Sequence, residues 1–175
     1  YQDQYRDNLV EIRGLEESLT KEKIADIDEE ISALEKEENT YDDQLDLVYQ
    51  QRDAINAAIE DARAKGYDTE SEYYKSLEKL MDENLEKEKS IIDARREYEQ
   101  EAFLEGLEGY KDRIASYKDQ EHGEISGELM VEEADAALQK IQERIDQLRR
   151  EDAKANKEEI EKLEDEYDEL YDSRL

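Results

Sequence analysis

The chain contains no proline in 175 residues. At an average usage of about 5%, roughly nine prolines would be expected in a chain of this length. Proline is the residue that a helix interior tolerates least, because it lacks the N–H donor and its ring clashes with the preceding turn. Its complete absence predicts a chain that is helical almost throughout.

Charge limits the size of the core that these helices can share. Asp, Glu, Lys and Arg make up 45% of the residues, and the apolar 36% includes twelve tyrosines, with one phenylalanine and no tryptophan. High charge with low hydrophobicity is also the composition of disordered chains. Helical periodicity in the apolar positions favours order, and this combination is typical of coiled coils.

The net charge of −29 arises from 54 acidic against 25 basic residues. It argues against nucleic-acid partners and anionic membrane surfaces, because both are bound through Lys and Arg. No run of about 20 apolar residues predicts a membrane-spanning helix, and no basic segment followed by an apolar one predicts a signal peptide. The absence of cysteine excludes disulfides and thiolate metal sites.

Apolar residues recur at alternating spacings of three and four from Ile24 to Ala62. This 3.5-residue repeat is the a/d seam of a coiled coil and predicts a helix over about 20–65. Glu38 and Arg52 interrupt the seam. Either they fix its register, or their side chains pack along it with the charged ends in water. The seam residues are Ile24, Ile27, Ile31, Leu34, Tyr41, Leu45, Val48, Ile55 and Ile59.

Residues 1–19 carry a shorter apolar series at Ile12, Leu15 and Leu19. The next seam residue, Ile24, is five residues further on, so the phase of the repeat changes near Thr20. Such a change indicates either a break or a local change of supercoil. We therefore expect residues 1–19 to form a helical extension, separate from an elongated bundle over 20–175.

A first turn is predicted around Gly66. This glycine suits the left-handed position after a helix, and Thr69 with Glu72 three residues later forms a capping box. A second helix over about 70–120 follows, with Leu77, Ile91 and Tyr98 on its apolar face.

A second turn is predicted from Gly123 and Gly127, which flank a serine. A third helix over about 128–175 then follows, and its pattern slips through 154–157 before it resumes at Ile160. At this slip, Asn156 with Glu159 forms either a second capping box or part of a stutter. Its seam residues are Leu138, Ile141, Ile145 and Leu148.

The expected fold is therefore all-α. Three segments of about 46 to 51 residues, each roughly 70–77 Å long, suggest an up-down-up antiparallel coiled-coil bundle or rod. The alternative is a single extended multimeric coiled coil that continues through both glycine-containing segments.

Candidate chemistry is sparse. His122 is the only histidine, and an exposed turn residue is the simplest interpretation of it. The acidic runs lack the ligand spacing of an EF-hand, so they are interpreted as solvated helix faces. We therefore predict no catalytic residues, metal site or cofactor, and no enzymatic activity.

Residues 65–98 begin with Lys-Gly-Tyr-Asp-Thr-Glu-Ser-Glu-Tyr-Tyr-Lys-Ser-Leu and continue as a Glu/Lys-rich helix. Together with the seam over 24–34, this stretch resembles the helical central regions of tail tape measure proteins from phages of Gram-positive gut bacteria. The resemblance covers about a third of the chain. It implies a virion protein that sets tail length, and no functional residues carry over.

Three functions are consistent with the sequence. The first is a structural coiled-coil spacer or scaffold in a phage tail, located in the virion. The second is a spectrin-like spacer of a cellular protein, with a cytoplasmic location expected. The third is an acidic helical module that recruits a basic protein partner. All three involve protein partners, whether other coiled coils or further copies of the chain.

Overall fold

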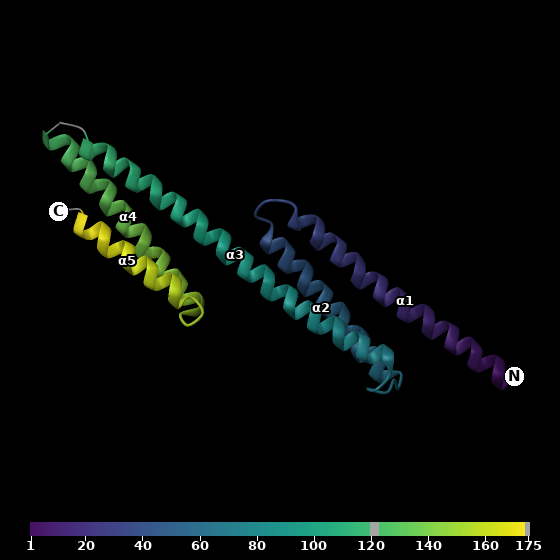
Figure 1. Ribbon diagram of the computed structural model, residues 1–175. Coiled ribbons are helices and arrows are strands. Elements are labelled where there is room, and N and C mark those ends of the chain that lie inside the picture. The colour runs from purple at the N-terminus through teal and green to yellow at the C-terminus, as the bar shows by residue number, and fades with distance from the viewer. Residues whose placement is uncertain (120–122, 174–175) are drawn as a thin grey trace. The chain divides into compact units, whose positions relative to one another are not determined.

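The computed structural model describes residues 1–119 and 123–173 (Figure 1). Within these residues the chain is all-α, as predicted, and no strand is present. The helices are α1 (Gln2–Glu35), α2 (Tyr41–Ala64), α3 (Glu72–Asp119), α4 (Gly123–Asp152) and α5 (Lys157–Ser173).

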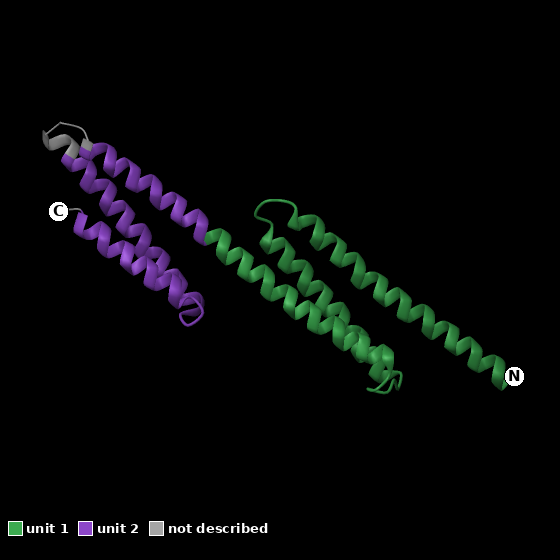
Figure 2. Ribbon diagram, viewed as in Figure 1, with its two compact units in different colours: residues 1–99 green, residues 100–175 purple. Residues whose placement is uncertain are grey.

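The chain divides into two compact units (Figure 2). Unit 1 is residues 1–99 and contains α1, α2 and the first part of α3. Unit 2 is residues 100–175 and contains the rest of α3 with α4 and α5. This division differs from the single bundle expected over 20–175, and turns at 36–40 and 153–156 divide two helices that were expected to be continuous.

The first of these turns lies at residues 36–40, inside the helix predicted over 20–65. Asn39 has a φ of 56°, a left-handed conformation that asparagine tolerates better than most residues. The Thr40 hydroxyl donates to the Leu34 carbonyl at 2.6 Å, which satisfies a backbone acceptor at the end of α1. Residues 35–40 contain no apolar side chain, so a helix there would bury nothing. The chain therefore reverses, and α2 returns alongside α1 (Figure 1).

The turn between α2 and α3 is centred on Gly66, which has a φ of 78°. The Tyr67 amide donates to the Ala62 carbonyl at 2.9 Å and the Gly66 amide to the Arg63 carbonyl at 3.1 Å. This pair of bonds is the Schellman motif, in which glycine takes the left-handed position.

The start of α3 differs from the predicted capping box of Thr69 and Glu72, because α3 begins at Glu72 itself. The Glu70 amide donates to the Asp68 carboxylate at 2.9 Å, which holds the intervening residues in a turn. Ser71 takes the capping position instead, and its hydroxyl accepts from the Tyr74 amide at 3.2 Å.

The predicted turn residues Gly123 and Gly127 are both helical in the structure. α4 begins at Gly123, so Gly127 is a helical residue rather than part of a turn. Gly127 is exposed and has no neighbour near its α-carbon, and an exposed helical glycine costs only about 1 kcal/mol relative to alanine. His122 lies outside the described residues.

A second turn divides the helix predicted over 128–175, because α4 ends at Asp152 and α5 begins at Lys157. The Asp152 carboxylate accepts from the Ala155 amide at 3.0 Å. The buried Asn156 amide donates to the Leu148 carbonyl at 3.0 Å, one turn before the end of α4. These side chains satisfy the backbone of the reversal, and the slip in the pattern through 154–157 is this turn.

Each unit has its own apolar interior. In unit 1, one cluster is centred on Ile31, Val48 and Ile91, and a second on Ala62, Tyr74 and Leu77. The interior of unit 2 is a single cluster drawn from three helices. It contains Leu107, Ile114, Ala134, Ala137, Leu138, Ile141, Ile145, Leu148, Ile160, Leu163 and Leu170.

Residues 1–19 are helical, but they do not form a separate element. α1 runs without a break from Gln2 to Glu35. The Thr20 hydroxyl donates to the Glu16 carbonyl at 2.9 Å within this helix. The phase change near Thr20 therefore moves the apolar face around one continuous helix.

Candidate functional site: a buried polar layer

Polar side chains from all three helices of unit 1 meet within its apolar interior. The two amides among them, Gln51 and Asn84, are 2% and 1% exposed. We call this set the polar layer. It consists of Asp28 from α1, Gln51 and Arg52 from α2, and Asn84, Lys87 and Glu88 from α3.

Asn84 is the central member of the polar layer. Its amide nitrogen donates to the Val48 carbonyl at 2.9 Å and to Gln51 Oε1 at 2.8 Å. Its oxygen accepts from Arg52 Nε at 2.9 Å. Donors and acceptor are thus all used, which is the condition under which a buried amide is tolerated.

Gln51 extends the network from α2 to α1. Its amide nitrogen donates to the Ile24 carbonyl at 3.0 Å and to Asp28 Oδ1 at 2.7 Å. Since its oxygen accepts from Asn84, this one side chain links all three helices. A shift of any helix by one residue would break several of these bonds together.

Two ion pairs form the half-buried edges of the polar layer. Arg52 on α2 pairs with Glu88 on α3, and Lys87 on α3 pairs with Asp28 on α1. Charge-assisted bonds of this kind are stronger than neutral ones, and each of these joins two different helices. The layer is therefore balanced in charge, with two cations and two anions.

Unit 2 contains a smaller buried pair between its last two helices. Arg144 on α4 donates to Glu159 on α5 at 3.2 Å, and their side chains are 9% and 12% exposed. Arg144 also donates to Gln147 at 3.4 Å. This pair lies close to the α4–α5 turn and connects the two helices on either side of it.

An aromatic and ionic cluster holds the α2–α3 turn against α1. The Tyr67 hydroxyl donates to Glu17 at 2.8 Å, and the Arg13 guanidinium lies 5.3 Å from the Tyr67 ring centre. Burial and this bond to Glu17 raise the pKa of Tyr67 to about 12. Lys65 lies 2.5 Å from Glu16, and hydrogen bonds to Glu16 and Asp61 raise the pKa of Lys65 above its ordinary value.

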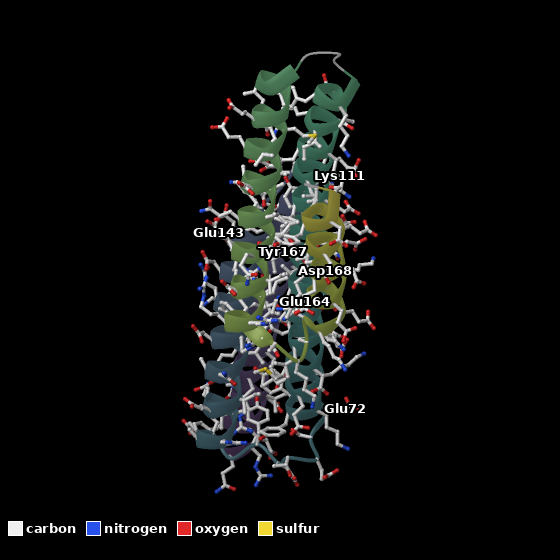
Figure 3. The ribbon with its side chains drawn as sticks, turned by 90° about the vertical axis from the view of Figure 1, so that its left-hand side faces the viewer. Glu72, Lys111, Glu143, Glu164, Tyr167 and Asp168 are labelled. Atoms are coloured by element: carbon white, nitrogen blue, oxygen red, sulfur yellow. The ribbon has the colours of Figure 1, made fainter. Side chains whose placement is uncertain are left out.

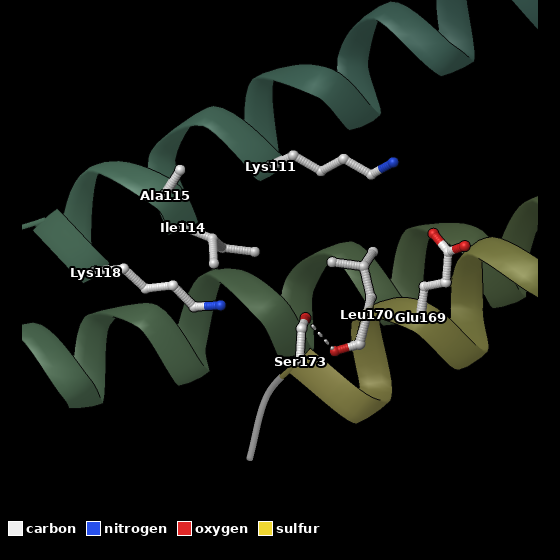
Figure 4. Close-up of a pocket in the computed structure, with 7 residues that line it drawn as sticks. All are labelled: Lys111, Ile114, Ala115, Lys118, Glu169, Leu170 and Ser173. Atoms are coloured by element: carbon white, nitrogen blue, oxygen red, sulfur yellow. Dashed lines mark hydrogen bonds between the residues drawn. The ribbon is translucent and has the colours of Figure 1, made fainter.

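A shallow groove of about 320 Å³ lies between α3 and α5 in unit 2 (Figure 4). Ile114 and Leu170 face each other across it, and Lys111 and Lys118 lie along its α3 side. Lys111 is bound to Glu166 at 2.6 Å, and this hydrogen bond raises the pKa of Lys111. The Ser173 hydroxyl donates to the Leu170 carbonyl at 3.0 Å, so Lys111 and Ser173 both bond to groups of the protein itself.

The predicted seam residues lie in or beside the two interiors. Ile27, Leu34, Tyr41, Ile59 and Tyr98 are half-buried, and the Tyr41 and Tyr98 ring centres are 5.7 Å apart. The remaining eleven are buried: Ile24, Ile31, Leu45, Val48, Ile55, Leu77, Ile91, Leu138, Ile141, Ile145 and Leu148.

Carboxylates lie mainly on the outer faces of the helices, where Figure 3 shows Glu143 and Glu164 projecting outward. Over the described residues, no group of three or more acidic, histidine or cysteine side chains has the arrangement of a metal site. In that same part of the chain, no helix has an apolar stretch of the length that a bilayer requires.

The two amides of the polar layer were not among the predicted seam residues, although their spacing from neighbouring apolar residues marks both as seam positions. Asn84 lies seven residues after Leu77 and seven before Ile91, which is a heptad position. Gln51 lies three residues after Val48 and four before Ile55, so the buried line of α2 passes through Gln51 rather than Arg52. A heptad assignment that admits polar residues at seam positions identifies both Gln51 and Asn84.

Comparisons with known proteins returned no match among protein-family models, curated proteins or solved structures.

Proposed function

We propose that this chain is a structural spacer or scaffold made of helical bundles, and that it has no catalytic role. The observation that carries the proposal is the polar layer of unit 1. Its buried amides and charged groups bond to one another and to backbone carbonyls across three helices. Buried polar groups in helical bundles fix register and partner orientation, so this use of polar chemistry is structural.

The helices themselves support the same proposal. α3 is a single helix of 48 residues that contributes to both units, so the chain passes from one unit to the next without a loop. Long helices joined by short turns are the usual construction of a helical spacer, and the described residues consist mainly of such helices.

The test replaces both amides of the polar layer with apolar residues of similar size in the parent gene. We expect Gln51→Leu combined with Asn84→Leu to leave the biological function intact, because the layer contributes packing and register only. A folded double variant that has lost the function would assign the layer a chemical role and contradict the proposal.

A matched pair of variant sets tests whether the fold itself is the functional product. Asp53→Asn, Glu158→Gln and Asp168→Asn change exposed carboxylates and are expected to be tolerated together. Ile31→Asn or Ile145→Asn is expected to abolish function through unfolding, since each places a polar group in a packed interior.

A narrower form of the proposal is the tail ruler implied by the resemblance at residues 65–98. In-frame deletion of a helical segment from the parent gene is then expected to shorten assembled tails by up to about 1.5 Å per deleted residue. Tails of unchanged length would exclude the ruler and leave the general spacer.

The net charge of −29 favours a second candidate, an acidic module that recruits a basic partner. Its signature is binding that weakens steeply as salt rises from about 50 mM to about 300 mM, since exposed charges are screened over this range. Pull-down of purified basic proteins across that range, with the exposed-carboxylate variant as control, distinguishes recruitment from passive spacing.

A further inference from the structure

The first half of α1 has an apolar face that unit 1 leaves exposed. Ile12, Leu15 and Leu19 are 51%, 65% and 64% exposed, and Tyr5 is 67% exposed. Leu9 is the most covered member, at 37%. We call Tyr5, Leu9, Ile12, Leu15 and Leu19 the apolar stripe.

The apolar stripe is a coherent surface rather than a scatter of exposed residues. At roughly 100° per residue, its five side chains fall within about 120° of the helix circumference. Val10 is equally apolar and 71% exposed, but it lies on another face of the same helix. An apolar arc of this width is the arc that a helix buries against a partner.

The other helices of unit 1 leave this arc uncovered, because the apolar residues in the first half of α1 lie on a different side of the helix from those in the second half. The buried residues further along α1, Ile24 and Ile31, lie about a third of a turn from the centre of the stripe around the helix. The residues around the α2–α3 turn contact α1 through Arg13 and Glu17, which lie on a different face from the stripe, and through Glu16 near the edge of the stripe. The phase change near Thr20 is therefore the feature that directs one face of α1 inward and another outward.

The spacing within the stripe is that of a two-stranded coiled coil. Tyr5, Ile12 and Leu19 are seven residues apart, and Leu15 and Asn8 fall at the intervening positions. A single asparagine in an otherwise apolar seam favours pairing of like helices, since its amide both donates and accepts.

Charge indicates which partner fits this surface. Residues 1–23 contain six acidic and four basic residues, whereas the whole chain has 54 against 25. Two copies of so acidic a chain repel each other over most of their surface, and this nearly balanced segment is where they approach at least cost.

The size of the stripe also fits a modest interface. Five large apolar side chains, between 37% and 67% exposed, would contribute from both copies of a symmetric pair, which corresponds to the small end of the range for specific interfaces. We propose that the apolar stripe is a self-association surface, through which two copies of this chain pair by the first half of α1.

The test is sedimentation equilibrium of the 175-residue chain from about 1 µM to about 300 µM, a range that captures micromolar affinity. We expect the mean mass to rise from 20.7 kDa toward twice that value. The double variant Ile12→Gln with Leu15→Gln is expected to weaken the pairing at least about tenfold, because it removes two apolar contacts from the centre of the interface.

Val10→Gln is the matched control, because it changes an equally exposed apolar residue on another face of the same helix. It is expected to leave the dissociation constant within about twofold of the parent. All substituted positions are exposed, so unchanged helicity by circular dichroism verifies that each variant is folded.

Two results would overturn the proposal. A parent chain that stays at 20.7 kDa throughout would show that the stripe serves a different partner. Pairing that the stripe variant leaves intact would place the contact elsewhere on the chain. Neither result bears on the spacer function, which is tested with the polar layer.

Discussion

Asn84 shows how one buried side chain connects the helices of a unit. Its amide contacts Val48, Gln51 and Arg52 on a neighbouring helix, and Gln51 carries the network on to α1. Apolar contacts are non-directional and permit a helix to slide by one turn, whereas these bonds have defined donors and acceptors. The residue thus contributes specificity in an interior that consists mainly of apolar side chains.

We expect Asn84→Leu to lower the free energy of unfolding by about 2–3 kcal/mol. The substitution leaves the Gln51 oxygen buried without its donor, which costs about 1–3 kcal/mol by itself. Adding Gln51→Leu removes that unpaired group and is expected to restore most of the loss. Urea denaturation of parent, single and double variants measures both effects, and a double variant less stable than the single one would contradict this account.

Tyr67 gives a prediction about alkaline pH. The folded-state pKa is about 12, above the ordinary value of 10.0, so the stabilising contribution is complete below pH 10 and is lost as pH rises toward 12. Tyr67→Phe lacks the hydroxyl bond to Glu17 and is expected to be about 0.5–1.5 kcal/mol less stable at neutral pH.

The same variant is then expected to lose less stability than the parent between pH 10 and pH 12. Burial also raises the pKa of Tyr73, so part of the alkaline loss persists in the variant. The control is Tyr49→Phe, at an exposed position, whose alkaline loss is expected to match that of the parent. If the free energy of unfolding fell equally with pH in Tyr67→Phe and in the parent, the hydroxyl of Tyr67 would have no stabilising role.

At the scale of the elements, the ends of the helices determine the architecture. The turns at 36–40, 65–71 and 153–156 each satisfy free backbone groups with nearby side chains or with glycine geometry. The turns held by these local bonds divide long apolar stretches into separate helices, and successive helices pack side by side.

The turn at Asn39 can be tested by changing backbone preference alone. Asn39 is exposed and has a φ of 56°, a conformation that glycine adopts freely and β-branched residues avoid. We expect Asn39→Gly to be neutral or stabilising by up to about 1 kcal/mol, and Asn39→Val to destabilise by about 1–2 kcal/mol. If the valine variant proved the more stable in thermal unfolding, the helix would instead continue through this position.

Sequence-based expectation and structure differ most at the turns over 36–40 and 153–156. The 3.5-residue repeat passes from Leu34 through Glu38 to Tyr41 without a change of phase, so periodicity alone cannot distinguish a helix from a hairpin there. The slip at 154–157 was visible, but a stutter in one helix leaves the same pattern. Prediction of helical content and of the turn at Gly66 needed only composition and local chemistry, whereas helix pairing depends on contacts distant in sequence.

The polar layer was harder to predict for a different reason. Arg52 was recognised as an interruption of the seam, but its partners Asn84 and Glu88 lie 32 and 36 residues away. Only the fold brings them together. The apolar stripe was partly visible as the series Ile12, Leu15 and Leu19, but its exposure became evident only when α2 and α3 were seen to cover a different face of α1.

At the scale of the whole molecule, stability is a balance between two modest interiors and a large excess of negative charge. The net charge of −29 produces repulsion among the helices of each unit, and the ion pairs offset only part of it.

We therefore expect the melting temperature to rise between about 10 mM and about 150 mM salt, because the screening length falls from about 30 Å to about 8 Å. Circular dichroism melts at several salt concentrations measure this directly. A melting temperature that falls with salt would show that attraction within ion pairs outweighs the repulsion.

The central claim is that the chain folds back on itself within each unit, and a distance measurement tests it most directly. The chain has no cysteine, so Lys23→Cys with Asp53→Cys places two spin labels on exposed positions of α1 and α2. The contact between Gln51 and Ile24 predicts adjacent helices, with a label separation of about 10–25 Å including the label arms. A separation near 45 Å, the length of a continuous helix over 30 residues, would contradict the fold and the function proposed from it.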